Sequence, residues 1–182
     1  MKLICAVAAL LLLSPQDKKA ANNDMKYDEK AGISLAKPPK NDEWDFKDKG
    51  FFDKCKIALV HKVDELGFDV LFQAPAANGT FDLKKVSEDA FTNMSGQTGV
   101  TEPKRIEIKN MKMPGLNVAA SYLEMTYKRA DKVQEFRQWS FIGKENQNLY
   151  MIVLHGEEGM YKKHQKVADF ILASIKTWKI PK

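Results

Sequence analysis

Cysteine is nearly absent from this chain. Of its two cysteines, Cys5 lies in an N-terminal apolar run and Cys55 lies much further along. Once the N-terminal run is removed, Cys55 has no partner for an internal disulfide, so packing alone must hold the fold. Because Cys55 alternates with Ile57 and Leu59, a buried and inert thiol is favoured over a reactive one.

Long hydrophobic runs are also lacking. The unbroken apolar run from Leu3 to Leu13 has eleven residues, and at about 1.5 Å per residue it is too short to cross a hydrocarbon core of roughly 30 Å. Lys2 precedes this run and Ser14-Pro15 ends it, which is typical of a secretory signal peptide. We therefore expect a signal peptide at 1–16, a flexible linker at 17–24, and a single secreted or periplasmic domain at 25–182 with no integral membrane span.

The sequence carries no strong charge of one sign. Its 29 basic and 24 acidic residues give a net charge of +5, and the two signs are interleaved along the chain. This balance is typical of a solvated mixed surface, and it gives no reason to expect nucleic-acid binding.

Motifs for catalysis, metals and cofactors are missing. The sequence has no H-E-x-x-H, C-x-x-C, G-x-S-x-G, G-x-G-x-x-G or Walker loop. Its three histidines are His61, His155 and His164. The segment from His155 to Glu157 and Glu158 resembles a metal half-site only loosely, and a helix entry explains the two carboxylates. We therefore expect no metal, no cofactor and no enzyme.

Most of the chain alternates apolar and polar residues with period two, as strands do. The expected strands form a hairpin that ends at Pro38-Pro39, a short strand at 44–46, a hairpin of 57–63 and 68–72, a strand at 104–113 after a loop at 96–103, a hairpin of 116–129 and 132–143, and a strand at 149–155. The last strand is apolar on both faces, so it should be central in the sheet.

Two segments follow helical spacing instead. Asp82 is the expected N-cap of a helix whose apolar residues continue to Met94, with Gly96 as the C′ residue. An apolar stripe from Tyr161 to Trp178 predicts a terminal helix. Tight turns between strands make the sheet antiparallel, and the two helices are expected on its two faces. The fold class is thus α+β, arranged as an α/β/α sandwich.

Two segments of the sequence resemble the PsbP-like fold superfamily, which includes exported bacterial DcrB-like proteins. They are the opening YDEKAGISLAKPPKNDEW and the closing PGLNVAASYLEMTYKR…FRQWSFIGKENQNLYMIVLHG…ILASIKTW. The similarity spans residues 25–180 and implies an α/β/α fold. It also implies a binding or assembly module in place of an enzyme.

Two groups of residues are candidate binding residues. Trp44, Phe46, Phe51 and Phe52 form an aromatic-rich segment that could be a binding lip, or could fold back onto the sheet as core. A basic set could face an acidic partner or anionic lipid, or could be a charged strand edge that deters aggregation; its members are Lys104, Arg105, Lys109 and Lys112.

We therefore expect a secreted or periplasmic, non-enzymatic interaction or assembly domain that binds a protein or envelope component. The alternative is a carrier or sensor of a small apolar ligand held between sheet and helix. A cavity of roughly 300 Å³ or more at that place favours the carrier, a flat aromatic patch near Phe51 and Phe52 favours the interaction domain, and a carboxylate or histidine cluster in a cleft favours a hydrolase.

The signal-peptide interpretation predicts processing. When the chain is exported with its native N-terminus, the mature protein should lack at least residues 1–14. Intact-mass measurement of the exported protein checks this, and a full-length species in the cytosol would contradict it.

Overall fold

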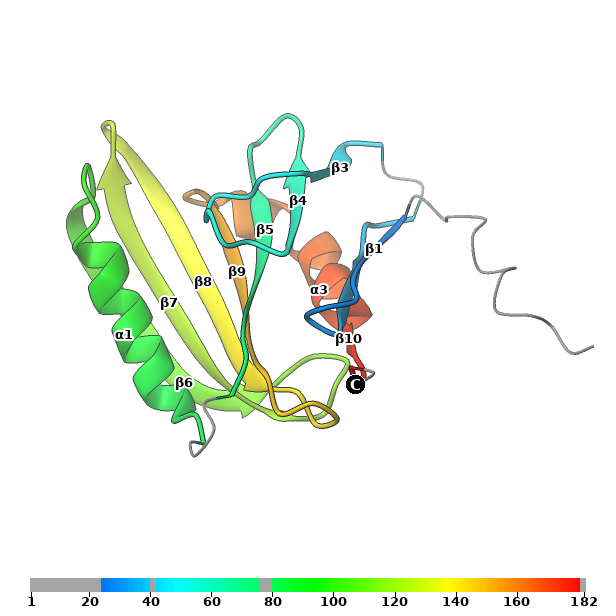
Figure 1. Ribbon diagram of the computed structural model, residues 1–182. Helices are drawn as coiled ribbons and strands as arrows, with labels where there is room; N and C mark the ends of the chain where they lie inside the picture. The colour runs from blue at the N-terminus through cyan, green and yellow to red at the C-terminus, as the bar shows by residue number, and fades with distance from the viewer. Residues whose placement is uncertain (1–23, 40–41, 76–79, 181–182) are drawn as a thin grey trace, which may run out of the picture.

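The computed structural model describes residues 24–39, 42–75 and 80–180 (Figure 1). The predicted signal peptide at 1–16 lies outside these ranges, as does the predicted linker apart from Asp24. Within the described residues, the helices are not long and apolar enough for any of them to cross a membrane.

Seven antiparallel strands form the large sheet of the described residues, in the order β3-β4-β5-β9-β8-β7-β6. The central position of β9 was predicted, because its residues are apolar on both faces. The strands are β3 (Trp44–Lys47), β4 (Ile57–His61), β5 (Gly67–Gln73), β6 (Thr101–Lys112), β7 (Ala119–Arg129), β8 (Lys132–Ile142) and β9 (Leu149–Glu157).

A second, smaller sheet joins the two ends of the described chain. Its strands are β1 (Met25–Asp28), β2 (Ile33–Ala36) and β10 (Lys176–Thr177), with β2 in the middle. Ser34 of β2 pairs with Lys176 of β10, and the Trp178 N–H donates to the Gly32 carbonyl over 3.1 Å. Strand β2 therefore pairs with β1 on one side and depends on β10, from the other end of the described chain, for pairing on its second side.

The large sheet separates two apolar cores. Neighbouring residues of β9 point to opposite sides: Ile152 and Leu154 belong to the larger core, while Val153 belongs to the smaller one. Helix α1 (Leu83–Ser95) lies along the smaller core, at the left of Figure 1. Helix α3 (Gln165–Ser174) places Ala168, Ile171 and Leu172 in the larger core.

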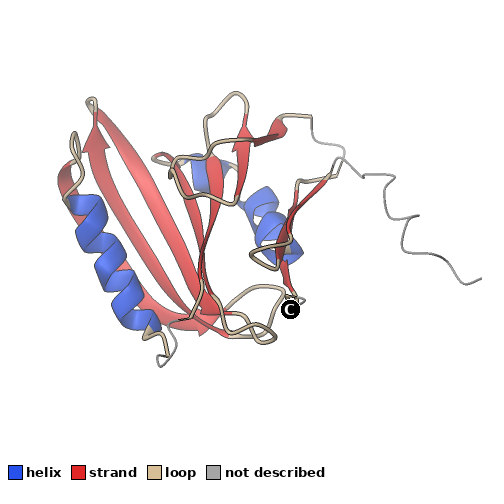
Figure 2. Ribbon diagram, viewed as in Figure 1, coloured by secondary structure: helices blue, strands red, loops and turns tan. Residues whose placement is uncertain are grey.

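The predicted antiparallel α+β architecture is confirmed, but a sandwich of helices on both faces describes it only in part. Helix α3 packs on β2, so one helix and the small sheet together make up the second layer. Figure 2 shows this mixture of helix and strand on the side of the sheet opposite α1.

The predicted continuous helix to Trp178 is wrong. A short helix, α2 (Met160–Lys163), precedes α3, and His164 lies between them. Helix α3 ends because Ile175 is extended, with ψ of 132°, so that the next residues can pair with β2. The apolar spacing does continue to Trp178, but strand pairing overrides the helical period.

Two strand boundaries also differ from the prediction. Strand β6 starts at Thr101 and not at 104. The strand can include Pro103 because it lies at the edge of the sheet, and its register shifts around this residue. Strand β4 ends at His61, and Val63 lies in the turn with 74% of its surface exposed. Helix α1 ends before Gly96 as predicted, although Gly96 has a right-handed conformation.

The position of Ile171 in the core makes α3 a test of this packing. Ile171→Ala should lower the free energy of unfolding by about 2–5 kcal/mol, as for other large aliphatic side chains removed from a core. Lys166→Ala changes an exposed residue of the same helix and should stay within about 0.5 kcal/mol. Urea melts of the two variants compare them, and equal effects would contradict the assigned face of the helix.

Candidate ligand-binding groove

Helix α1 begins where the sequence places its cap. The Asp82 carboxylate accepts hydrogen bonds from the backbone N–H groups of Lys84 and Lys85, at 3.0 and 3.1 Å. This capping fixes the start of the helix. From there α1 packs on β6, β7 and β8, so strands β9 and β5 extend beyond the part of the sheet that it covers.

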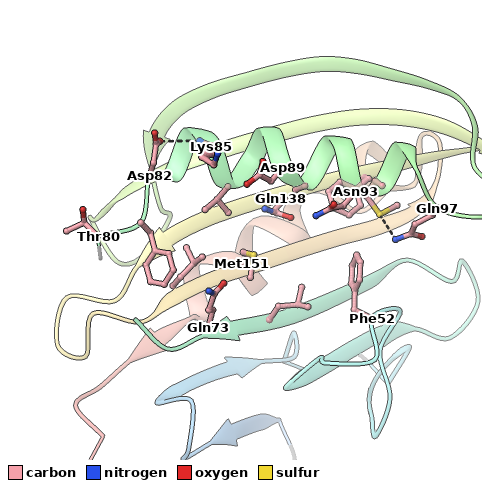
Figure 3. Close-up of a pocket in the computed structure, with 17 residues that line it drawn as sticks. Phe52, Gln73, Thr80, Asp82, Lys85, Asp89, Asn93, Gln97, Gln138 and Met151 are labelled. Atoms are coloured by element: carbon pink, nitrogen blue, oxygen red, sulfur yellow. Dashed lines mark hydrogen bonds between the residues drawn. The ribbon is translucent and has the colours of Figure 1, made fainter. Parts of the chain in front are cut away.

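A groove of about 580 Å³ lies between α1 and the uncovered strands. Figure 3 shows its side chains between the helix and strands β8, β9 and β5. Most of the side chains inside it are apolar: Leu71, Leu149 and Met151 from the sheet, Val86, Ala90 and Met94 from α1, and Phe52, Phe81 and Phe136 around them.

The floor of the groove carries one buried amide. Gln138 is 3% exposed, and its Nε2 donates to Ser140 Oγ over 2.8 Å. Ser140 pairs across the strands with Ser121, whose hydroxyl lies 2.8 Å from that of Ser87 on α1. A series of neutral polar side chains therefore leads from Gln138 in the groove to Ser87 on the side of α1 that faces the sheet.

Among the described residues that line the groove, the charged side chains lie only at its outer edge. Asp82, Lys85 and Asp89 are exposed on α1, while the remaining polar residues at this edge are neutral. Figure 3 labels these groups along the helix and along β5. The interior of the groove is thus apolar with a neutral hydrogen-bonding group.

The structure separates the four predicted aromatic residues. Trp44 is 0% exposed within the larger core, so its assignment to a binding surface is corrected. Phe46 packs against that core. Phe51 and Phe52 contact each other at 5.0 Å between ring centroids and pack on the smaller core, and Phe52 reaches the groove.

The predicted basic residues lie on β6, at one edge of the large sheet. Lys104 and Arg105 are exposed, and the Arg105 guanidinium lies 5.6 Å from the Phe91 ring centroid. Lys109 Nζ lies 2.6 Å from Glu107 Oε2. The β6 edge thus mixes both signs of charge, and a role for its basic residues in binding stays a prediction.

A second group of polar side chains lies beside Phe51 and consists of Cys55, Asp69 and His155. Asp69 is fully buried and lies 3.9 Å from His155 Nε2, and Asp69 Oδ2 accepts a hydrogen bond from the Phe52 N–H. Burial, followed by the charge of Asp69, raises the pKa of the Cys55 thiol to about 12. A thiol with this pKa is a poor nucleophile at neutral pH.

One group of metal-ligating side chains occurs among the described residues. His61, Asp64 and His164 each offer a ligand atom, and these atoms lie within 4.8 Å of one another. Sequence reasoning missed this group, because His164 is distant in sequence from the other two and no spacing rule connects them. The turn after His61 supplied a weak signal, since it places Asp64 three residues further on.

The chain has the PsbP-like fold. It is similar to the cyanobacterial PsbP protein CyanoP of Synechocystis sp. PCC 6803, with a TM-score of 0.62 and 14% identity over 88% of this chain and 96% of that one. It is also similar to LpqN of Mycobacterium tuberculosis, described as involved in cell envelope biogenesis, with a TM-score of 0.55 and 12% identity over 87% and 86% of the two chains.

A protein of Bacteroides thetaiotaomicron gives a TM-score of 0.54 at 10% identity, with 87% of this chain aligned to 50% of that one. No protein-family model and no curated protein sequence matches the chain. The PsbP-like fold that the sequence resemblance implied is therefore confirmed.

The environment of Cys55 predicts low reactivity. At pH 8 the folded protein should react with 5,5′-dithiobis(2-nitrobenzoic acid) on the order of 1000-fold more slowly than the unfolded protein, because the raised pKa depletes the reactive thiolate by about that factor. Reactivity should rise as the pH approaches the raised pKa. Absorbance at 412 nm follows the reaction, and Cys55→Ser corrects for any other thiol. Equal rates in the folded and unfolded states would contradict this environment.

Proposed function

We propose that this protein is an extracytoplasmic, non-enzymatic binding domain whose groove between α1 and the sheet takes a small amphiphilic ligand. The groove itself is the observation that carries the proposal. Its volume of about 580 Å³ exceeds the size that favours a carrier and falls within the usual range for small-molecule sites.

The lining determines the class of ligand. Leu71, Met151 and Ala90 offer an apolar surface to a hydrocarbon body, and each buried methylene contributes about 0.8 kcal/mol to binding. Gln138 offers a neutral amide to one polar group of the ligand. A fully charged ligand group would lose its hydration there without a countercharge, so uncharged or weakly polar amphiphiles are favoured.

This proposal joins the two hypotheses made from the sequence. A lipid-like molecule is both a small apolar ligand and an envelope component. The expected signal peptide supports an extracytoplasmic location. The structural likeness to LpqN, a protein described as involved in cell envelope biogenesis, is compatible with it. The apolar lining and the raised pKa of Cys55 support a binding role over catalysis.

Filling the groove tests the proposal. Ala90 lies on the groove side of α1, so the added ring of Ala90→Phe should occupy space that a ligand needs. We expect it to weaken binding of a fluorescent monoacylglycerol analogue, an uncharged amphiphile, at least tenfold, or about 1.4 kcal/mol. Fluorescence titration measures the affinity, and native mass spectrometry of the exported protein identifies any ligand that co-purifies.

Glu88→Phe is the matched control, because Glu88 is exposed on α1 and does not line the groove. It should leave the affinity unchanged. Equal affinities for both variants would contradict a ligand site in the groove. If a protein partner is captured instead and Phe51→Ala or Lys104→Ala weakens its capture, the interaction domain is favoured.

A further inference from the structure

A compact group of side chains joins the β4–β5 turn to the start of α3, away from the groove. His61 ends β4 and Asp64 follows in the turn, while His164 lies between α2 and α3. The ring centroids of the two histidines are 4.4 Å apart. The Trp44 ring lies 5.2 Å from the His61 ring and 6.2 Å from the His164 ring, so an apolar wall covers one side of the group.

The two nitrogens of His61 have different partners. Nε2 lies 3.2 Å from Glu43 Oε2, and Nδ1 accepts a hydrogen bond of 3.1 Å from the Asp64 N–H. Nδ1 also faces Asp64 Oδ2 at 3.7 Å. The ring is 2% exposed, so these contacts fix its orientation.

Asp64 is the shared acceptor of the group. The same oxygen, Oδ2, lies 2.5 Å from His164 Nε2 and 2.7 Å from Lys163 Nζ. The hydrogen bonds from Lys163 and then from His164 lower the pKa of Asp64 to about 2. Two imidazole nitrogens thus meet one carboxylate oxygen, whose other neighbour is an exposed lysine.

We propose that His61, Asp64 and His164 form a binding site for a divalent transition-metal ion, with Zn²⁺ as the ion that this set fits best. Two histidines and one carboxylate are a common zinc ligand set, and the fourth position is left to water or another ligand. Ligand atoms around tetrahedral zinc are separated by about 3.3 Å, and the 3.7 Å between His61 Nδ1 and Asp64 Oδ2 is near that value. In binding, the ion would replace two hydrogen bonds of the group: the one that His61 Nδ1 accepts from the Asp64 N–H, and the 2.5 Å contact between His164 Nε2 and Asp64 Oδ2, which would lengthen.

The neighbours of the site support the assignment. Glu43 contacts the His61 nitrogen that faces away from Asp64, as the carboxylate partners of zinc-ligating histidines do. Such a partner orients the ring and increases the basicity of its other nitrogen. Lys163 competes with a metal for Asp64, but its side chain is 57% exposed and can turn to solvent.

Zinc titration of the exported, metal-stripped protein tests the proposal. Isothermal titration calorimetry should detect one Zn²⁺ per chain, and histidine ring NMR signals of His61 and His164 should shift while those of His155 do not. His164→Ala should weaken zinc binding more than tenfold. Glu43→Gln should weaken it about 10–100-fold without removing a ligand.

His155→Ala is the matched control, because His155 is the third histidine of the chain and lies outside the group. It should leave the zinc affinity unchanged, and Lys163→Met should leave it unchanged or increase it. If the folded wild-type protein and the Lys163→Met variant both fail to bind Zn²⁺, or if His155→Ala weakens binding as much as His164→Ala, the proposal is overturned. These outcomes are independent of the monoacylglycerol titration of the groove.

Discussion

Strand β9 must bury both of its faces, and the rest of the architecture follows from that requirement. Its two edges are paired with β5 and β8, so it has no exposed side along the sheet. Ile152 and Leu154 face one core and Val153 faces the other. Both sides of the sheet therefore need a covering layer, and the chain supplies one with α1 and the other with α3 and the small sheet.

The two layers differ in how much they cover, and that difference creates the groove. A helix with its side chains is about 10–12 Å wide, and neighbouring strands lie about 4.8 Å apart. One helix therefore covers two or three strands, and α1 covers β6, β7 and β8. Leu71 on β5 and Met151 on β9 are only half-buried. A wider layer on this side would have removed the cavity.

Much of this fold was predictable from local patterns. Asp82 predicted the start of α1 because an N-cap is a local hydrogen-bonding requirement, and the apolar run of β9 predicted its central place. The end of α3 was not predictable in the same way. Ile175 and Trp178 keep helical spacing, and only pairing with β2, far back in the sequence, selects the extended conformation.

The candidate sites were less predictable than the fold for the same reason. The aromatic pair Phe51 and Phe52 was identified from composition, but burial by the smaller core depends on residues far along the chain, such as Phe136. Likewise, His61 and His164 meet only because the junction between α2 and α3 lies beside the β4–β5 turn, where Lys163 and His164 contact Asp64. A pattern within ten residues contains no information on such contacts.

The pairing of β10 with β2 has a consequence for how the chain matures. Ser34 meets its partner Lys176 only after the roughly 140 residues between them have been synthesised. Contacts between such distant residues slow folding, because loop closure is unfavourable until they form. A chain that emerges N-terminus first therefore leaves β2 without its second neighbour until β10 has been synthesised.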